Sequence, residues 1–446
     1  MTTVRSDTDV IIVGSTLGGL VTATYLARAG LRVVLLEEQT HRKRPVLLRE
    51  PFLLPGLGSQ GPVREVLREL ALPLIEQREI RTEPVSVQVI LPDARIDACP
   101  DTKALSTELE SYELGARATT LRWLELLAEQ GRDMRDQLWH HAAPVSSGST
   151  RAPNLTQRLQ RAVAVRPPAG VSIATRLPDT PAGLRGFAEA LVRGLSGCSD
   201  GLGPAPALLI DGACRANNRM PDSTTPFLDL FRRRFIQLHG EVWTVDSFGV
   251  ISTRGELGIE LPNRRALARA LVIAAPRDPL QSFLDENGDA PRWLRKGLPV
   301  ATAAAEIFRA ERDQLPVGLG TRVIVAQGLP EDVLSLAFHP DRDHEGVEWL
   351  VAAGPGSRLL NHENPLQELA PFSTEGLVRV DPGPTPRWDL DTRELVFPAA
   401  VSRPMPRQRA PIALVGPELT PGLGPEGEIL QARNVALELI DRLARD

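Results

Sequence analysis

The alternation of apolar and polar residues is most regular in the first forty positions. Residues 10–13 form a short β-branched run, typical of a strand buried on both faces. Residues 18–30 carry apolar side chains at helical spacing, and Gly30 ends that pattern. A second apolar run, residues 31–36, follows directly. This segment therefore predicts strand, turn, helix and strand, the start of a parallel sheet.

The predicted turn carries Gly14, Gly18 and Gly19. Gly14 permits a tight reversal, and the other two let the helix start close to the strand and leave its first N–H groups free for a pyrophosphate. Glu37 ends the second strand, where a carboxylate can accept bonds from ribose hydroxyls. Thr16 stands at the second glycine of G-x-G-x-x-G, where its side chain crowds a ligand or its hydroxyl bonds a phosphate oxygen. These residues predict a dinucleotide site, or a fold whose glycines only pack helix against strand.

The composition is that of an ordinary globular protein of two or three lobes. The 446 residues are 42% hydrophobic and 24% charged, with a net charge of −5, which excludes the basic surface of a nucleic-acid-binding protein. The three cysteines form no C-x-x-C pair, and His140-His141 has no third ligand at a motif spacing, so we expect no metal.

Two further absences bear on location. The first eight residues are too short and polar for a secretion signal, and no apolar run reaches the ~18 residues that span a bilayer. We therefore expect a cytoplasmic protein with no transmembrane segment. Peripheral membrane contact stays open, because it depends on the exposure of helix faces.

The remaining pattern alternates helical and strand-like segments. Helices are predicted at residues 62–72, 101–140, 181–195, 225–239 and 426–443. Strands are predicted at residues 85–91, 94–98, 242–245, 249–253, 257–261, 270–274, 303–308, 322–326, 333–338, 347–352, 395–400 and 411–415. We divide the chain into the first part of a dinucleotide-binding domain (1–100), a helical cap and substrate region (101–219), the second part of the dinucleotide-binding domain (220–298), an antiparallel substrate lobe (299–380) and the C-terminal part of the dinucleotide-binding domain (381–446).

This order of elements resembles the carotenoid (phytoene) desaturase and amine oxidase superfamily, and the middle segment and tail are more similar to the desaturase branch. The glycine turn, the sequence His239-Gly240-Glu241-Val242 and the final glycine-rich turn before a helix carry the resemblance. It implies an α/β fold, with a Rossmann-like FAD-binding domain, an interleaved antiparallel substrate domain and a helical cap.

The resemblance also implies FAD as the cofactor and assigns residues to it. The first turn, with Gly14, Ser15, Thr16, Gly18 and Gly19, would hold the pyrophosphate, and Glu37, with Glu38 beside it, the ribose. Arg44 would be the remnant of a Gly-Gly-Arg signature that is otherwise absent, and Val242 would lie beside the adenine. Gly416, Glu418, Gly424 and Gly427 would cover the ribityl chain and flavin ring, with Glu418 in place of an Asp that Pro417 replaces.

The implied activity is an FAD-dependent oxidoreductase acting on a small apolar or hydroaromatic molecule, with no catalytic residue identified. An amine substrate is less favoured, because the chain has only Tyr25 and Tyr112 for an aromatic cage and no lysine in the strand after Pro299. Trp123, Trp139, Trp349 and Trp293 could line a substrate lobe or belong to its core. The alternative is a flavin-free pseudoenzyme that binds proteins or lipids, similar to the Rab GDP-dissociation inhibitors.

Overall fold

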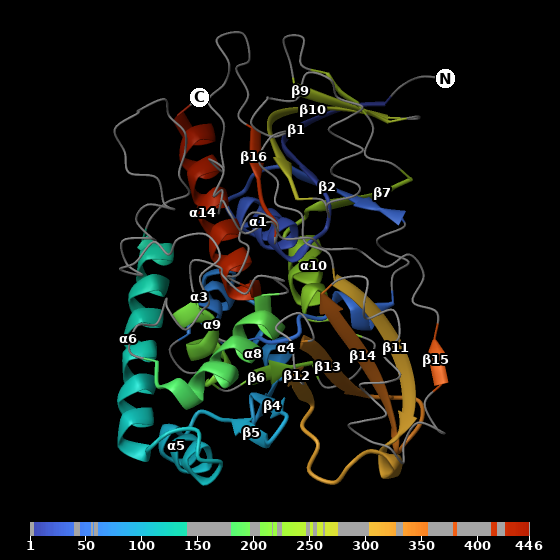
Figure 1. Cartoon of the computed structure of the whole chain (residues 1–446). Helices are drawn as coiled ribbons and strands as arrows, with labels where there is room; N and C mark the ends of the chain where they lie inside the picture. The colour runs from blue at the N-terminus through green and yellow to red at the C-terminus, as the bar shows by residue number, and fades with distance from the viewer. Residues whose placement is uncertain are drawn as a thin grey trace.

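The computed structural model describes residues 4–39, 45–54, 57, 61–140, 180–196, 206–215, 217–220, 225–246, 250–252, 257–261, 264–274, 303–326, 333–355, 378–380, 412–416 and 424–445. Arg44, Glu418 and the predicted strand at 395–400 lie outside these residues. The chain forms two lobes, one built on a mainly parallel sheet and one on an antiparallel sheet with a group of helices beside it (Figure 1).

The sheet of the first lobe joins strands from three separate segments of the chain. Its order is β7-β2-β1-β10-β9-β8, and β16 pairs with the second half of β10. The strands are β1 (Val4–Val13), β2 (Val33–Glu38), β7 (Glu241–Val245), β8 (Val250–Ser252), β9 (Leu257–Leu261), β10 (Arg264–Ile273) and β16 (Ile412–Leu414). All pair in parallel except β8 and β9, which form an antiparallel edge. This arrangement is the predicted Rossmann-like sheet.

The first strand is longer than its apolar pattern predicts. Residues 10–13 are completely buried, but β1 begins at Val4, because residues 4–8 pair with residues 264–268 of β10. The polar residues in this extension gave no strand signal in the sequence. Their pairing with a distant strand forms the extension, and no local pattern encodes it.

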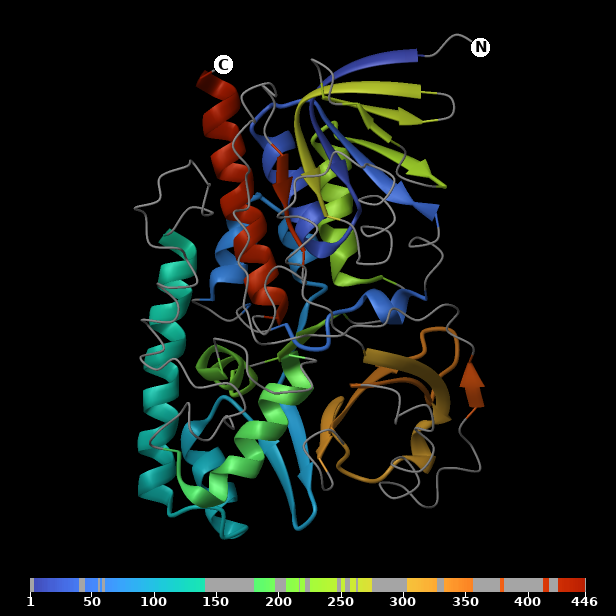
Figure 2. The ribbon, with the colours of Figure 1, turned by 45° about the horizontal axis from the view of Figure 1, so that its top comes forward.

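Helices cover the first sheet and bury its apolar residues. They are α1 (Leu17–Arg28), α3 (Pro62–Glu69), α10 (Phe227–Gln237) and α14 (Gly424–Arg445). Every residue of α1 from Leu17 to Ala27 is buried, since the sheet, α10 and α14 surround it. Figure 2 shows α14 running alongside α1 and the sheet. The helix carries no charged side chain before Arg28, because it is enclosed on all sides.

The second sheet has the order β15-β11-β14-β13-β12-β4-β5. Its strands are β4 (Val87–Leu91), β5 (Ala94–Ala98), β11 (Ala303–Glu311), β12 (Arg322–Ala326), β13 (Val333–Pro340), β14 (Val347–Pro355) and β15 (Val378–Val380). The sheet is antiparallel, as predicted, except that β12 and β4 pair in parallel. The hairpin of β4 and β5 therefore lies in the second lobe, whereas we had assigned residues 1–100 to the dinucleotide-binding domain. Local alternation predicts a hairpin but not the sheet that it joins.

A group of helices packs beside the second sheet as the predicted cap. It comprises α5 (Thr102–Ser111), α6 (Arg117–His140), η3 (Ala182–Leu184), α8 (Arg185–Ser196) and α9 (Pro206–Ala213). Asp101 caps α5, since its carboxylate accepts from the amides of Lys103 and Ala104 at 2.9 and 3.2 Å. The predicted single helical region ends at Ser111 and resumes at Arg117. Glu113 between them adopts a left-handed backbone with φ 58°, which a continuous helix does not allow.

Short elements connect the two lobes. They are η1 (Val46–Arg49), α4 (Leu74–Gln77) and the ribbon of β3 (Arg81–Glu83) with β6 (Asn217–Arg219), whereas η4 (Arg312–Gln314) links β11 to β12 within the second lobe. The guanidinium of Arg322 in β12 is buried and donates to the carbonyls of Phe52 and Phe338 at 2.7 and 3.1 Å. Glu50 accepts from the amide of Phe227 at 2.8 Å. These buried polar contacts fix the segment after η1 against both α10 and the second sheet.

Burial of the Glu50 carboxyl raises its pKa from 4.5 to about 7. The folded protein therefore keeps a proton that the unfolded chain releases as the pH rises above 4.5, so the free energy of unfolding falls between these two values. Glu50→Gln keeps an acceptor for the Phe227 amide and removes the titration. We expect Glu50→Gln to lose less stability than the wild type between about pH 5 and about pH 8, measured by chemical denaturation. Glu241→Gln, a change at the exposed start of β7, is the control and should keep the wild-type dependence; a Glu50→Gln profile parallel to the wild type would contradict the expectation.

The close packing of α1 on the sheet predicts that a larger residue at position 19 destabilises the protein. A Cβ atom at Gly19 would lie 2.5 Å from the carbonyl oxygen of Gly14 and 2.8 Å from Cβ of Ala274. Gly19→Ala should therefore lower the free energy of unfolding by about 1–3 kcal/mol. Gly186→Ala on α8 is the matched control, because nothing lies within 4 Å of its Cβ position; helix propensity should leave it as stable as the wild type or more so. Equal losses in the two variants would show that close packing is not what requires glycine at position 19.

Candidate functional site

The glycine turn between β1 and α1 has the backbone course that was predicted from the sequence. Gly14 follows β1 with φ 102°, a backbone conformation that residues other than glycine rarely adopt. Its amide donates to the carbonyl of Leu36 at 2.9 Å. Gly19 brings the first turn of α1 against the carbonyl of Gly14. Ser15 and Thr16 between them are buried. The first turn of α1 therefore points its amides toward the end of β1.

The amides of Gly18 and Gly19 are not free, contrary to the prediction from the sequence. Thr16 is the N-cap of α1, and its Oγ1 accepts from the amide of Gly19 at 3.3 Å. The amide of Gly18 donates to Oε1 of Glu428 in α14 at 2.6 Å. The hydroxyl at the second-glycine position thus has a capping function within the protein, which accounts for a β-branched residue there.

Glu37 lies where the sequence places a ribose-binding acid, at the end of β2 and next to β7. The residue is 3% exposed, and Oε2 lies 3.4 Å from Nη2 of Arg232 in α10. Glu37 is in register with Thr244 of β7, and Val242 is in register with Leu35. Val242 packs against the core of the first lobe. Glu37 and Val242 are therefore on neighbouring strands beyond the glycine turn, as predicted, but the carboxylate already has a cationic partner.

The end of β16 and the start of α14 lie near the glycine turn, because β16 pairs in parallel with the end of β10 and α14 contacts α1. The amide of Gly416 donates to Oε1 of Gln431 at 3.4 Å, and Gly424, with φ 61°, begins α14. Gly427 is buried in the next turn of the helix. Gly424 and Gly427 lie in the first part of α14, the helix whose Glu428 contacts the start of α1.

A buried ion cluster fastens the start of α14 to the helical cap. Arg135 of α6 donates to Glu426 of α14 at 2.7 Å and to Asp211 of α9, and all three side chains are buried. Arg215 also pairs with Asp211 at 2.9 Å. Each acid of this cluster has a guanidinium partner, as buried charges require. The cluster therefore fixes the turn that carries Gly424 and Gly427.

The aromatic residues named as candidate linings belong to packed structure. Trp123 is buried in the cap core and donates to Thr180 at 3.1 Å. The Trp139 ring stacks under Arg433 at 3.8 Å, and that of Trp349 lies under Arg309 at 5.9 Å. Tyr25 donates to Glu69 at 2.5 Å within the first lobe. Trp293 lies outside the described residues.

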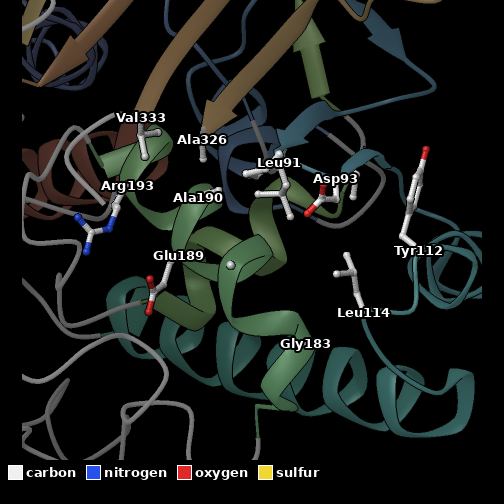
Figure 3. Close-up of a pocket in the computed structure, with 13 residues that line it drawn as sticks. Leu91, Asp93, Tyr112, Leu114, Gly183, Glu189, Ala190, Arg193, Ala326 and Val333 are labelled. Carbon is white, nitrogen blue, oxygen red and sulfur yellow. The ribbon is translucent and has the colours of Figure 1, made fainter. Parts of the chain in front are cut away.

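A cavity of about 300 Å³ lies in the second lobe, away from the glycine turn. Its walls come from the β4–β5 turn, the α5–α6 connection, α8 and the ends of β12 and β13. Figure 3 shows Glu189 and Arg193 on α8 at one side and Asp93 with Tyr112 at the other. No residue of β1, α1, β2 or α14 lines it, so this cavity does not adjoin the predicted cofactor site.

Sequence reasoning missed Glu428 and Arg232, which contact predicted site residues. Both are charged residues in amphipathic helical patterns, where the default expectation is a solvent-facing position. Glu428 stands next to the apolar pair Ile429-Leu430, which is a weak sign of burial. Nothing local could have indicated its partner, since Gly18 is 410 residues away.

The parallel sheet and this turn form a Rossmann-like α/β fold of the kind that binds dinucleotides. Residues 7–46 match the model of a protein family described as the FAD binding domain. This match covers the first strand, the glycine turn, α1 and β2, and it supports FAD as the cofactor that the fold accommodates.

Solved structures with the same fold cover the whole chain. A variant of putrescine oxidase has a TM-score of 0.59 at 16% identity, over 99% of this chain and 100% of that chain. An oxidoreductase from Methanosarcina mazei has a TM-score of 0.57 at 15% identity, over 96% and 99%. Cyclohexylamine oxidase from Brevibacterium oxydans has a TM-score of 0.54 at 15% identity, over 99% and 100%. None of the curated proteins matches the sequence. These structures confirm the predicted fold, and the desaturase branch stays a prediction.

Two classes of feature are missing from the described part of the chain. No described helix is both long and apolar enough to cross a membrane. No group of three or more His, Cys, Asp or Glu residues among the described residues could hold a metal ion.

The capping contact of Thr16 gives a direct test of the local structure. Thr16→Val keeps the shape of the side chain and removes the acceptor for the Gly19 amide, so the free energy of unfolding should fall by about 1 kcal/mol. Thr16→Ser keeps the acceptor and should remain within a few tenths of a kcal/mol of the wild type. Urea denaturation of both variants measures the difference. If Thr16→Val were as stable as Thr16→Ser, the hydroxyl would have no capping role.

Proposed function

We propose that the protein is an FAD-dependent oxidoreductase that dehydrogenates a small apolar or hydroaromatic molecule. The observation that carries this proposal is the position of Glu37, a buried carboxylate at the end of β2, beyond a glycine turn whose Gly14 has φ 102°. A carboxylate in that position accepts bonds from the ribose hydroxyls of a dinucleotide. The match of residues 7–46 to the FAD binding domain supports FAD over other dinucleotides.

The residues of the two glycine turns fit this assignment in part. Gly14, Ser15 and the start of α1 would hold the pyrophosphate, Glu37 the ribose, and the β7 segment around Val242 the adenine. The start of α14, with Gly424 and Gly427, would lie along the ribityl chain and flavin. FAD, when bound, supplies the electron-accepting chemistry. The chain would orient the bound flavin, because the Arg135 cluster fixes the start of α14.

The proposal of an apolar substrate depends on the positions and contacts of the tyrosine and lysine side chains. Tyr25 is engaged with Glu69 between α1 and α3, and Tyr112 lies on the connection after α5 in the cap, so neither supports an aromatic cage for an amine. Lys103 lies in α5 of the cap and not in the strand after Pro299, where an amine oxidase would be expected to place a lysine. Two of the structural relatives are oxidases named for amines, but at 15–16% identity they share only the fold. An apolar substrate agrees better with this set of side chains.

The second candidate is a flavin-free protein that uses the same fold for binding proteins or lipids. This candidate is favoured by contacts within the protein that occupy the groups predicted to bind the cofactor. Gly18 donates to Glu428, Gly19 donates to Thr16, and Glu37 pairs with Arg232. A protein that never holds a dinucleotide would need such internal partners.

The visible absorbance spectrum of the purified protein, before and after incubation with excess FAD and removal of free FAD, separates these candidates. We expect flavin bands that stay with the protein. Glu37→Gln should weaken FAD binding about tenfold to a hundredfold, as expected for the loss of a charge-assisted hydrogen bond. Glu65→Gln on α3, a partly exposed residue paired with Arg68, is the matched control and should bind as the wild type does. A colourless protein that retains no added FAD would exclude the oxidoreductase and favour the binding protein.

A further inference from the structure

The carboxylate of Glu428 lies at the N-terminus of α1. The residue is 6% exposed, and Oε1 accepts the amide hydrogen of Gly18 at 2.6 Å. This distance is at the short end for a bond between an amide and an anionic acceptor. The first turn of a helix favours a negative charge, because its amides have no partner within the helix. An internal carboxyl group therefore occupies a position that helix geometry favours for anions.

Gly18 makes this contact possible. A Cβ atom at position 18 would lie 2.4 Å from Cγ1 of Val415 and 3.1 Å from Oε1 of Glu428. The space that the missing side chain leaves is therefore filled by the end of β16 and by α14. The glycine that the sequence assigns to a pyrophosphate contact instead lets a carboxylate approach the helix.

The surroundings of Glu428 contain no compensating cation among the described residues. Glu426, two residues earlier, pairs with Arg135, but no described ion pair includes Glu428. The only charged residue of α1 is Arg28 at its opposite end, and β16 carries none. Burial raises the pKa of Glu428 to about 7, and the bond from Gly18 acts in the opposite direction. The carboxylate is therefore stabilised by the start of α1 and destabilised by the loss of water.

We propose that Glu428 occupies the anion position at the start of α1 and sets the affinity of the chain for FAD, so that the FAD pyrophosphate engages the turn only when Glu428 is protonated or turned away. This proposal rests on the proposed FAD site. A pyrophosphate and an ionised Glu428 are like charges that require the same amides, and the two cannot share them in a buried site. Glu428 is thus an affinity-determining residue for the cofactor.

The experiment measures the dissociation constant of FAD by equilibrium dialysis at about pH 6 and about pH 8. Glu428→Gln removes the charge and keeps the size of the side chain. We expect Glu428→Gln to bind FAD at least about tenfold more tightly than the wild type at the higher pH, with a smaller gap at the lower pH, where the wild-type residue is protonated. ADP carries the pyrophosphate without the flavin, and it should show the same ratio at each pH.

Glu438→Gln is the matched control, since it removes a charge from the same helix at a partly buried pair with Arg442. It should bind FAD and ADP as the wild type does at both pH values. The wild type alone provides a second readout that needs no variant, because its affinity should weaken from the lower to the higher pH. Equal dissociation constants for wild type and Glu428→Gln at both pH values would overturn the role of Glu428 and leave the FAD site standing. If no variant binds FAD at either pH, the FAD site itself fails, and the role of Glu428 with it.

Discussion

The enclosure of α1 is the constraint on which the two-lobed arrangement depends. The helix is buried from Leu17 to Ala27, so it must be covered by the sheet on one side and by α10 and α14 on the others. Those covering elements come from the middle and the end of the chain. The intervening segments build the second lobe, and β3 with β6 joins it to the first. The interleaving of the two lobes follows from enclosing one apolar helix.

Acidic side chains from elsewhere in the chain accept hydrogen bonds at the start of two helices, and their charged partners differ in a way that matters for function. Glu50 accepts from the first residue of α10, and Glu428 accepts from the second residue of α1. Neither carboxylate forms an ion pair among the described residues, and burial raises the pKa of both to about 7. Glu426, by contrast, is matched by the buried guanidinium of Arg135. The paired charges of the Arg135 cluster fix α14 to the helical cap, whereas Glu50 and Glu428 can change protonation near neutral pH.

The sequence predicts those parts of the fold that have a local periodicity. The apolar cores of β1, β2 and β12, the Asp101 cap and the extent of α14 follow from alternation, helical spacing and capping chemistry. The extension of β1 to Val4 and the membership of β4 and β5 in the second sheet depend on pairing with distant strands. Local pattern carries no information about such partners.

In the candidate site, too, the positions that depend on local pattern could be predicted, and the contacts with distant segments could not. Gly14, Gly19 and Glu37 lie where spacing places them, because strand, turn and helix geometry relate them directly. The partners of Gly18 and Glu37, which are Glu428 and Arg232, come from helices that meet the turn only after the whole lobe has assembled. The sequence therefore predicts which polar groups lie at the turn, but not which side chains form hydrogen bonds or ion pairs with them.

The contact between α1 and α14 also has a consequence for how the chain reaches its folded state. The apolar surface of α1 exists as soon as the first strands and helix are synthesised, but the helix that covers its last side consists of residues 424–445. The first lobe cannot close before the ribosome has made those residues. During synthesis the exposed flank of α1 is a surface for chaperones and for aggregation, and a chain that stops before residue 424 would keep it exposed.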